Sequence, residues 1–113
     1  MVKTKRIYET PSGADGKRIL VDRLWPRGVR KDKASIDEWL KEISPSDGLR
    51  KWFGHDPSRW EEFRKKYRAE LRGKKDLVEK LRKEARDGTV TLLFAAKDTE
   101  HSNAEVIREL LSE

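Results

Sequence analysis

The sequence predicts an α/β fold, in which a small three-stranded and partly parallel sheet carries about five helices. Two apolar segments, residues 18–25 (RILVDRLW) and 89–96 (TVTLLFAA), have turn residues on their flanks and read as strands. Between them, and again after residue 101, apolar residues recur at helical spacing. Two strands separated by helices are most simply parallel neighbours joined by a right-handed crossover.

The strand assignments rest on apolar runs between turn signals. A first strand is expected over residues 5–10 (KRIYET), before the turn-forming stretch PSGADGK. In the second strand, residues 19–21 form a continuous apolar run, which is typical of a strand covered on both faces. The third strand, residues 89–96, is the most strongly predicted element of the chain because it is β-branched, aromatic and mostly apolar.

The helix assignments rest on spacing and on capping residues. The expected helices cover residues 36–43, 47–53, 57–72, 77–87 and 101–111. Ser46 or Asp47 can cap the second helix, and Gly54 can end it. Asp56 and Pro57 suit the cap and first position of the third helix, whose apolar stripe contains Trp60, Phe63, Tyr67 and Leu71. Asp98 or Thr99 can cap the last helix.

Length and composition exclude several classes of protein. The 113 residues fit a single domain spanning 1–113. The absence of cysteine excludes disulfides, thiolate metal sites and a thiol nucleophile. No apolar stretch reaches the length of a membrane span, and the N-terminus lacks the apolar core of a signal peptide, so no membrane association and a cytoplasmic location are expected.

The chain is basic, with a formal net charge of +6 and a sequence pI of about 9.7. A basic balance favours anionic partners, including nucleic acid, nucleotides and phosphate. The densest basic segment runs from Arg64 to Arg86 and could lie along phosphates if its cations share one surface. The favoured alternative is a solvated, thermostable surface of ion pairs, because the chain has no Gln, one Asn and one Met.

A candidate site lies where the parallel strands are expected to end, because open α/β sheets bind ligands beyond the carboxyl ends of their strands. Arg23, Arg27 and Lys97 follow the predicted strands and could hold one phosphate or carboxylate. Their alternative role is to bind carbonyls and carboxylates of the loops themselves. The further candidate ligand-binding residues are Trp25 and Trp52, as walls, and Asn103.

Both histidines are candidates for acid–base chemistry. His55 either faces the strand ends as a general acid or base, or stacks on Trp60 as a hydrophobic staple, and the local sequence favours the staple. His101 lies near Asp98 and Glu100. It either forms the second catalytic candidate with Asp98 or makes capping contacts at the start of the last helix, and the second role is favoured. The spacing of these residues has no recognised metal signature, so no metal ion and no cofactor are predicted.

Four strings in the chain resemble a known family. RILVDRLWPRG, WLKEISPS, LRKWFGHDPSRWEEF and VTLLFAAKD, the last followed by His101 and Asn103-Ala104, resemble the YeaO-like family of small bacterial and archaeal proteins. The resemblance covers nearly the whole chain and implies a compact α/β fold, but it brings no activity, substrate or cofactor. After His101 the family often reads Asn-Asn-Ala or Asn-His-Ala, whereas this chain reads Ser102-Asn103-Ala104 and so lacks an amide side chain at position 102.

The family's recurring positions fall on the loops that the strand-end argument selects. Those positions are Asp22, Arg23, Trp25, Pro26, Arg27, Gly28, Trp52, Phe53, Gly54, His55, Asp56, Lys97, Asp98, His101 and Asn103. The first functional hypothesis is therefore a protein with an anion-binding cleft, with or without catalysis. The alternatives are a nucleic-acid-binding module that uses the basic helical face, and a non-catalytic structural or interaction protein. The sequence leaves the oligomeric state open.

Overall fold

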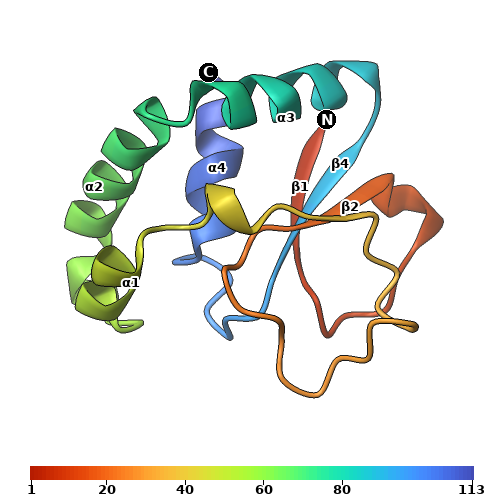
Figure 1. The fold of residues 1–113 in the computed structure, drawn as a ribbon, viewed down its shortest axis with the longest axis horizontal. Coiled ribbons are helices and arrows are strands. Elements are labelled where there is room, and N and C mark those ends of the chain that lie inside the picture. The colour runs from red at the N-terminus through yellow and green to blue at the C-terminus, as the bar shows by residue number, and fades with distance from the viewer.

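A computed structural model, which describes residues 1–113, contains one four-stranded parallel sheet (Figure 1). The strand order is β1-β4-β2-β3, and all three neighbouring pairs are parallel. The strands are β1 Val2–Arg6, β2 Lys17–Leu20, β3 Glu38–Trp39 and β4 Val90–Phe94. The α/β class is confirmed, whereas the expected three-stranded, partly parallel sheet is corrected to four parallel strands.

The first strand begins and ends earlier than the sequence suggested. It ends at Arg6 because the chain turns there: the Glu9 N–H donates to the Arg6 carbonyl, and the Glu9 carboxylate accepts the Arg6 N–H at 2.7 Å. The second strand is shorter than predicted. Val21 still donates to the carbonyl of Leu93, but the chain then leaves the sheet at Asp22.

The prediction of a helix over residues 36–43 is wrong. The backbone there pairs with β2, since Asp37 N–H donates to the Arg18 carbonyl and Leu40 N–H to the Leu20 carbonyl. Only Lys41–Ile43 coil, as one 3₁₀ turn. The apolar spacing misled because its residues serve opposite faces: Ile36 and Trp39 pack on one side of the sheet, and Leu40 and Ile43 on the other.

Four α-helices are present instead of five: α1 Asp47–Phe53, α2 Trp60–Arg72, α3 Lys75–Asp87 and α4 Asn103–Leu111. The predicted caps of α1 are confirmed. The Ser46 side chain accepts from Leu49 N–H, and Gly54 takes a left-handed conformation. Asp56 and Pro57 begin a 3₁₀ turn that leads into α2. The cap of α4 is Ser102 and not Asp98 or Thr99.

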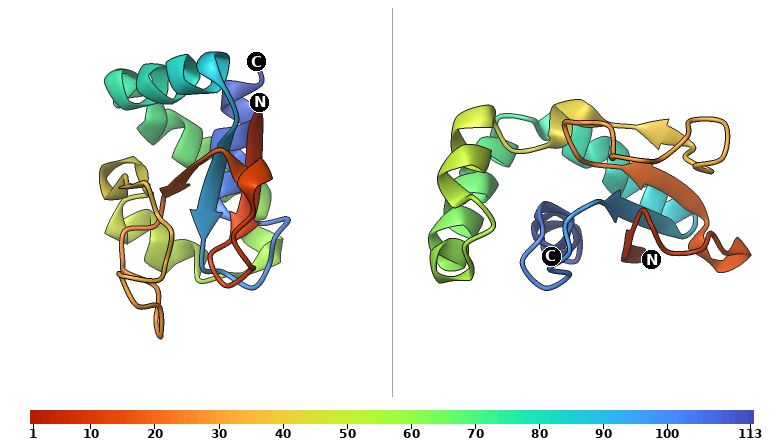
Figure 2. Two further views of the ribbon diagram at one scale, coloured as in Figure 1. Left: turned by 90° about the vertical axis from the view of Figure 1, so that its right-hand side faces the viewer. Right: turned by 90° about the horizontal axis from the view of Figure 1, so that it is seen from below.

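The two faces of the sheet are covered in different ways (Figure 2). One face, here the helix face, holds an 18-residue apolar cluster that includes Ile19, Leu92 and Phe63. The other, here the loop face, holds only Ile7, Leu20 and Leu93, over which Trp25, Val29, Ile36, Trp39 and Ala95 pack. Successive strand residues point to opposite faces, so β4 serves both layers.

A buried polar network completes the loop face. The Arg18 guanidinium donates to the Asp15 carboxylate and, through Nε, to the Ser35 carbonyl at 2.7 Å. Lys5 Nζ lies 3.1 Å from the same carboxylate, and the Thr91 hydroxyl donates to the Asp15 carbonyl. Burial raises the pKa of Asp15, but the Ser12 N–H and the two cations outweigh it and leave that pKa below its usual value.

One glycine is required by close approach. A Cβ on Gly16, where φ is +62°, would lie 2.2 Å from the carbonyl oxygen of Thr89. This contact lets the chain enter β2 directly beside β4. None of the helices is long and apolar enough to cross a bilayer.

Candidate functional site

The carboxyl ends of the two central strands are joined by one side chain, Asp22. Its carboxylate accepts the backbone N–H of Ala95 at 2.8 Å, so it links the second residue after β2 with the first residue after β4. From there the chain leaves β2 over the loop face and leaves β4 toward α4 on the helix face. Such a topological switch is where open parallel sheets place their ligands.

Asp22 itself is a perturbed acid. Burial raises its pKa, against the opposing effects of the Ala95 N–H, the Asn103 amide and the charge of His55. Its own carbonyl accepts the indole N–H of Trp39 at 2.7 Å. Asp22 is absent from the predicted site residues. Its position directly after the apolar run of β2, in a recurring family motif, was the available signal.

Asn103 has a structural contact at this edge. Its amide Nδ2 donates to the Val21 carbonyl at 2.9 Å and so ties the first residue of α4 to the end of β2. Tyr67 of α2 lies nearby, fully buried, and its hydroxyl donates to the Ile43 carbonyl at 2.6 Å. Burial, with the charges of Asp22 and Glu70, raises the pKa of Tyr67, so the phenol stays neutral.

Arg23 is the unusual cation of the site. It is half-buried, makes no ion pair, and its Nε is buried without a hydrogen-bond partner. It forms no ion pair with the adjacent Asp22. The Arg23 charge instead acts on Asp47, Tyr67 and Lys74, which places it between the start of α1 and the end of α2.

The other predicted ligand residues lie in different surroundings. Arg27 is exposed, and its carbonyl accepts the Tyr8 hydroxyl at 2.9 Å on the loop side. Trp25 packs edge-on against Trp39, with ring centroids 5.3 Å apart. Lys97 is exposed after β4 and forms no hydrogen bond. Arg23 thus faces the helices, whereas Arg27 and Trp25 belong to the loop side.

Trp52 lies on the outer side of α1. Lys66 Nζ is 4.3 Å from its ring centroid, and the Arg59 guanidinium carbon is 5.4 Å away. The partly exposed indole therefore contacts two cations of the following segment, 59–66.

The prediction that His55 stacks on Trp60 as a hydrophobic staple is wrong. His55 follows Gly54 with a second left-handed backbone conformation, φ +57° after φ +53°, and this turns its exposed ring toward Phe53, at 6.4 Å. The imidazole that meets Trp60 is that of His101, edge-on at 5.1 Å. Local spacing could not reveal this pair because the two residues are far apart in the chain.

His101 and Asp98 form the expected pair. His101 Nδ1 lies 2.7 Å from Asp98 Oδ2, and Asp98 Oδ1 accepts the N–H groups of Glu100 and His101. The hydrogen bond to His101 is the main reason that the pKa of Asp98 is lowered. No serine or threonine hydroxyl bonds to the His101 ring, so the pair has no attached nucleophile. His55 is not part of it.

Five of the eleven cations in residues 60–87 form ion pairs, and the other six form none. Arg64, Lys66, Arg68, Lys80 and Arg82 all pair with glutamates. This agrees with the favoured alternative of a solvated face with ion pairs.

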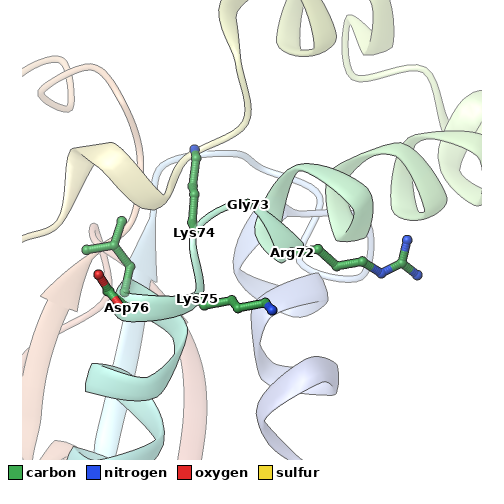
Figure 3. Close-up of a pocket in the computed structure, with 6 residues that line it drawn as sticks. Arg72, Gly73, Lys74, Lys75 and Asp76 are labelled. Carbon is green, nitrogen blue, oxygen red and sulfur yellow. The ribbon is translucent and has the colours of Figure 1, made fainter.

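A groove of about 460 Å³ lies at the junction of these two helices. It is lined by Arg72, Gly73, Lys74, Lys75, Asp76 and Leu77. Arg72 and Lys75 project to the right in Figure 3, whereas Lys74 points upward in that view and donates to the Ser44 carbonyl at 2.9 Å. The cations that line the groove therefore do not converge on one point. No three His, Asp or Glu side chains in the structure could together hold a metal ion.

The fold and this edge define a small parallel α/β protein whose central strands end at a buried aspartate. The chain belongs to the DUF488 family, because the model of its branch described as the "Inactive DUF488-N3 subclade" matches residues 1–113. It is similar to the uncharacterized protein YeaO of Escherichia coli K12, with 42% identity over 97% of this chain and 96% of that protein. The resemblance to YeaO-like proteins is confirmed.

Mycobacterial proteins are similar to a comparable degree. The uncharacterized proteins Rv3073c of Mycobacterium tuberculosis and Mb3100c of Mycobacterium bovis are each 40% identical over 98% of this chain and 93% of their own length. No solved structure matches the chain.

Proposed function

We propose that this chain is a non-catalytic binding protein for a small phosphate or carboxylate ligand, with Arg23 as the anchor. The observation that carries the proposal is the half-buried Arg23 guanidinium, whose buried Nε has no acceptor. An unpaired donor of this kind is unfavourable in a folded protein unless a ligand or an ordered water accepts its hydrogen bond. A guanidinium offers parallel N–H groups that match the oxygens of a phosphate or a carboxylate.

A second cation strengthens the positive potential there. Burial lowers the pKa of Lys74, and the charge of Arg23 lowers it further, against the opposing charge of Glu70. The two cations therefore repel each other, and a bound anion would relieve that repulsion. Arg27 and Lys97, which are exposed, would contribute only long-range attraction that salt screens.

The absence of catalysis is supported by the family branch and by the site. The matching branch is described as inactive. The Asp98–His101 pair lacks a nucleophile, and the His55 side chain forms no hydrogen bond.

An acid–base enzyme is the second candidate. Burial raises the pKa of Asp22, and the charge of His55 acts on the same carboxyl. A perturbed acid beside a histidine at a strand end is a common catalytic arrangement.

The two histidines give a direct test. Amide signals of residues 22–24 and the imidazole signal of His55 would be followed by NMR while inorganic phosphate or acetate is added. His101, bonded to Asp98 and packed on Trp60, is the internal control. We expect saturable shifts near Arg23 and none at His101.

Two variants sharpen the test. Arg23→Ala should abolish the shifts, whereas Arg27→Ala, which removes an exposed arginine of the same segment, should keep them. Equal responses of the two variants, or no response of the parent protein to either anion, would refute the proposed anchor. Amide spectra and thermal midpoints would establish that both variants are folded.

A further inference from the structure

We propose that the basic loop, defined as residues 23–33, binds single-stranded nucleic acid together with Trp25 and Trp39 at its base. The proposal does not depend on the Arg23 anion site. The sequence suggested a nucleic-acid surface on the basic helices. The proposal places that surface on the basic loop instead, on the opposite side of the molecule.

The charge of the basic loop is dense and available. Arg23 turns toward the helices and is not counted here. The remaining ten residues, 24–33, hold four cations and one carboxylate, a net charge of +3, whereas the helical segment 60–87 needs 28 residues for a net charge of +4. Arg27 and Lys33 are exposed and form no ion pair, and Arg30 pairs only with the equally exposed Asp32. Phosphates could therefore approach without first breaking a buried contact.

Two tryptophans lie beside these cations. Trp25 and Trp39 are partly exposed over the loop-face cluster and meet edge-on. Their indole N–H groups donate to the carbonyls of Val29 and Asp22, each at 2.7 Å, and these bonds fix the ring planes. Aromatic faces held rigidly next to positive charge are the features with which proteins bind single strands without reading sequence.

A lysine lies over each ring. Lys31 Nζ is 5.5 Å from the Trp25 centroid, and Lys41 Nζ is 5.1 Å from the Trp39 centroid. An exposed cation–π contact is weaker than the stacking of a base on an aromatic side chain. A base could therefore displace the flexible lysine, and the lysine would stay close enough to neutralise the adjoining phosphate.

The position of the basic loop suits an extended ligand. The loop projects beyond the carboxyl ends of the strands, with no helix over it (Figure 1, Figure 2). The Tyr8 hydroxyl holds its backbone at the Arg27 carbonyl. The exposed Leu24 would also suit an anionic membrane, but the two fixed indoles favour nucleic acid.

The test measures anisotropy of a labelled 12-nucleotide single strand, as RNA and as DNA, across a range of salt. The loop variant is R27A/K31A/K33A. The matched control is R72A/K75A/K83A. It also removes one arginine and two lysines, which lie on α2 and α3 and form no ion pair. We expect at least tenfold weaker binding for the loop variant at low salt and less than threefold for the control. The slope of log K against log salt should fall by about 2 in the loop variant.

Further arms identify the ligand class. Inorganic polyphosphate of equal charge should bind more weakly than the oligonucleotide, because it has no bases to stack. Equal losses in the two variants, equal affinity for polyphosphate, or binding only to phosphatidylserine vesicles would overturn the proposal. The loop variant should keep the phosphate-induced NMR shifts near Arg23. If the loop does not bind nucleic acid, the proposed anion site is therefore not contradicted.

Discussion

The helix face and the loop face of the sheet are stabilised by different means. The helix face is an apolar cluster, filled by side chains from four helices and the strands. The loop face has three buried apolar residues and relies on a salt-bridged network of Asp15, Arg18 and Lys5. The face that needs charge to stabilise it is also the face on which the basic loop lies.

This difference has a physical consequence. An apolar layer tolerates the loss of one member by partial relaxation, whereas a buried charge depends wholly on its partner. Substitutions on the two faces should therefore differ in size and in their dependence on pH.

The largest effect is expected for Asp15→Ala. The change leaves the buried Arg18 guanidinium without its carboxylate and should cost about 3–5 kcal/mol of unfolding free energy, measured by urea denaturation. Asp32→Ala, which removes the exposed partner of Arg30, is the control and should cost less than about 1 kcal/mol. Similar costs for the two variants would mean that the network does not stabilise the loop face.

Adjacent leucines of β4 compare the faces directly. Leu92 and Leu93 are both fully buried but point to the helix face and the loop face respectively. Leu→Ala at such sites costs about 2–5 kcal/mol. Leu92→Ala should cost more than Leu93→Ala, because the loop that covers Leu93 can settle into the space, and both should cost less than Asp15→Ala. The reverse order in urea unfolding would show that the loop is the more rigid cover.

Two tyrosines give a smaller comparison. The hydroxyls of Tyr67 and Tyr8 each donate to a backbone carbonyl, one buried on the helix face and one exposed beside the basic loop. Tyr67→Phe should cost about 1 kcal/mol, because the Ile43 carbonyl loses its buried donor. Tyr8→Phe should cost close to nothing, since water replaces the hydroxyl. Thermal unfolding of both variants measures the difference.

The smallest expected effect is on how the unfolding free energy changes with pH, and it has opposite signs for Asp15 and Asp22. The pKa of Asp15 is lowered, so its stabilising contribution is present above its unfolded value of about 3.8 and is lost as the pH falls through the folded pKa. The pKa of Asp22 is raised, so its contribution is present below that value and is lost as the pH rises through the folded pKa.

Asparagine variants measured between pH 3 and 7 separate the two signs. Relative to the parent protein, Asp22→Asn should gain unfolding free energy as the pH rises, and Asp15→Asn should lose it. A parallel pH response of the two variants would contradict the assigned directions.

The sequence predicted best what local chemistry determines. The apolar stripe of α2, the caps at Ser46, Gly54 and Asp56, and the strand β4 are all present. The false helix over residues 36–43 arose because one apolar spacing served two faces of the sheet. The short strand β3 pairs only two residues with β2 and gave no periodic signal.

The sequence predicted where the candidate site lies better than it predicted which side chains meet there. Loops after β2 and β4 do meet, and the Asp98–His101 contact follows from their closeness in sequence. The contact of Trp60 with His101 and the link from Asp22 to Ala95 depend on residues brought together only by the crossover. No pattern within a short window contains them.

The outer edge of β1 has a consequence for self-assembly. An exposed parallel strand is a template on which another chain can pair and start aggregation. Here the Glu9 carboxylate already occupies the Arg6 N–H, and Lys3, whose ammonium donates to the Ala14 carbonyl, adds an unpaired positive charge on that strand. A second copy would meet an occupied donor and a positive charge, so the chain should resist edge-to-edge stacking.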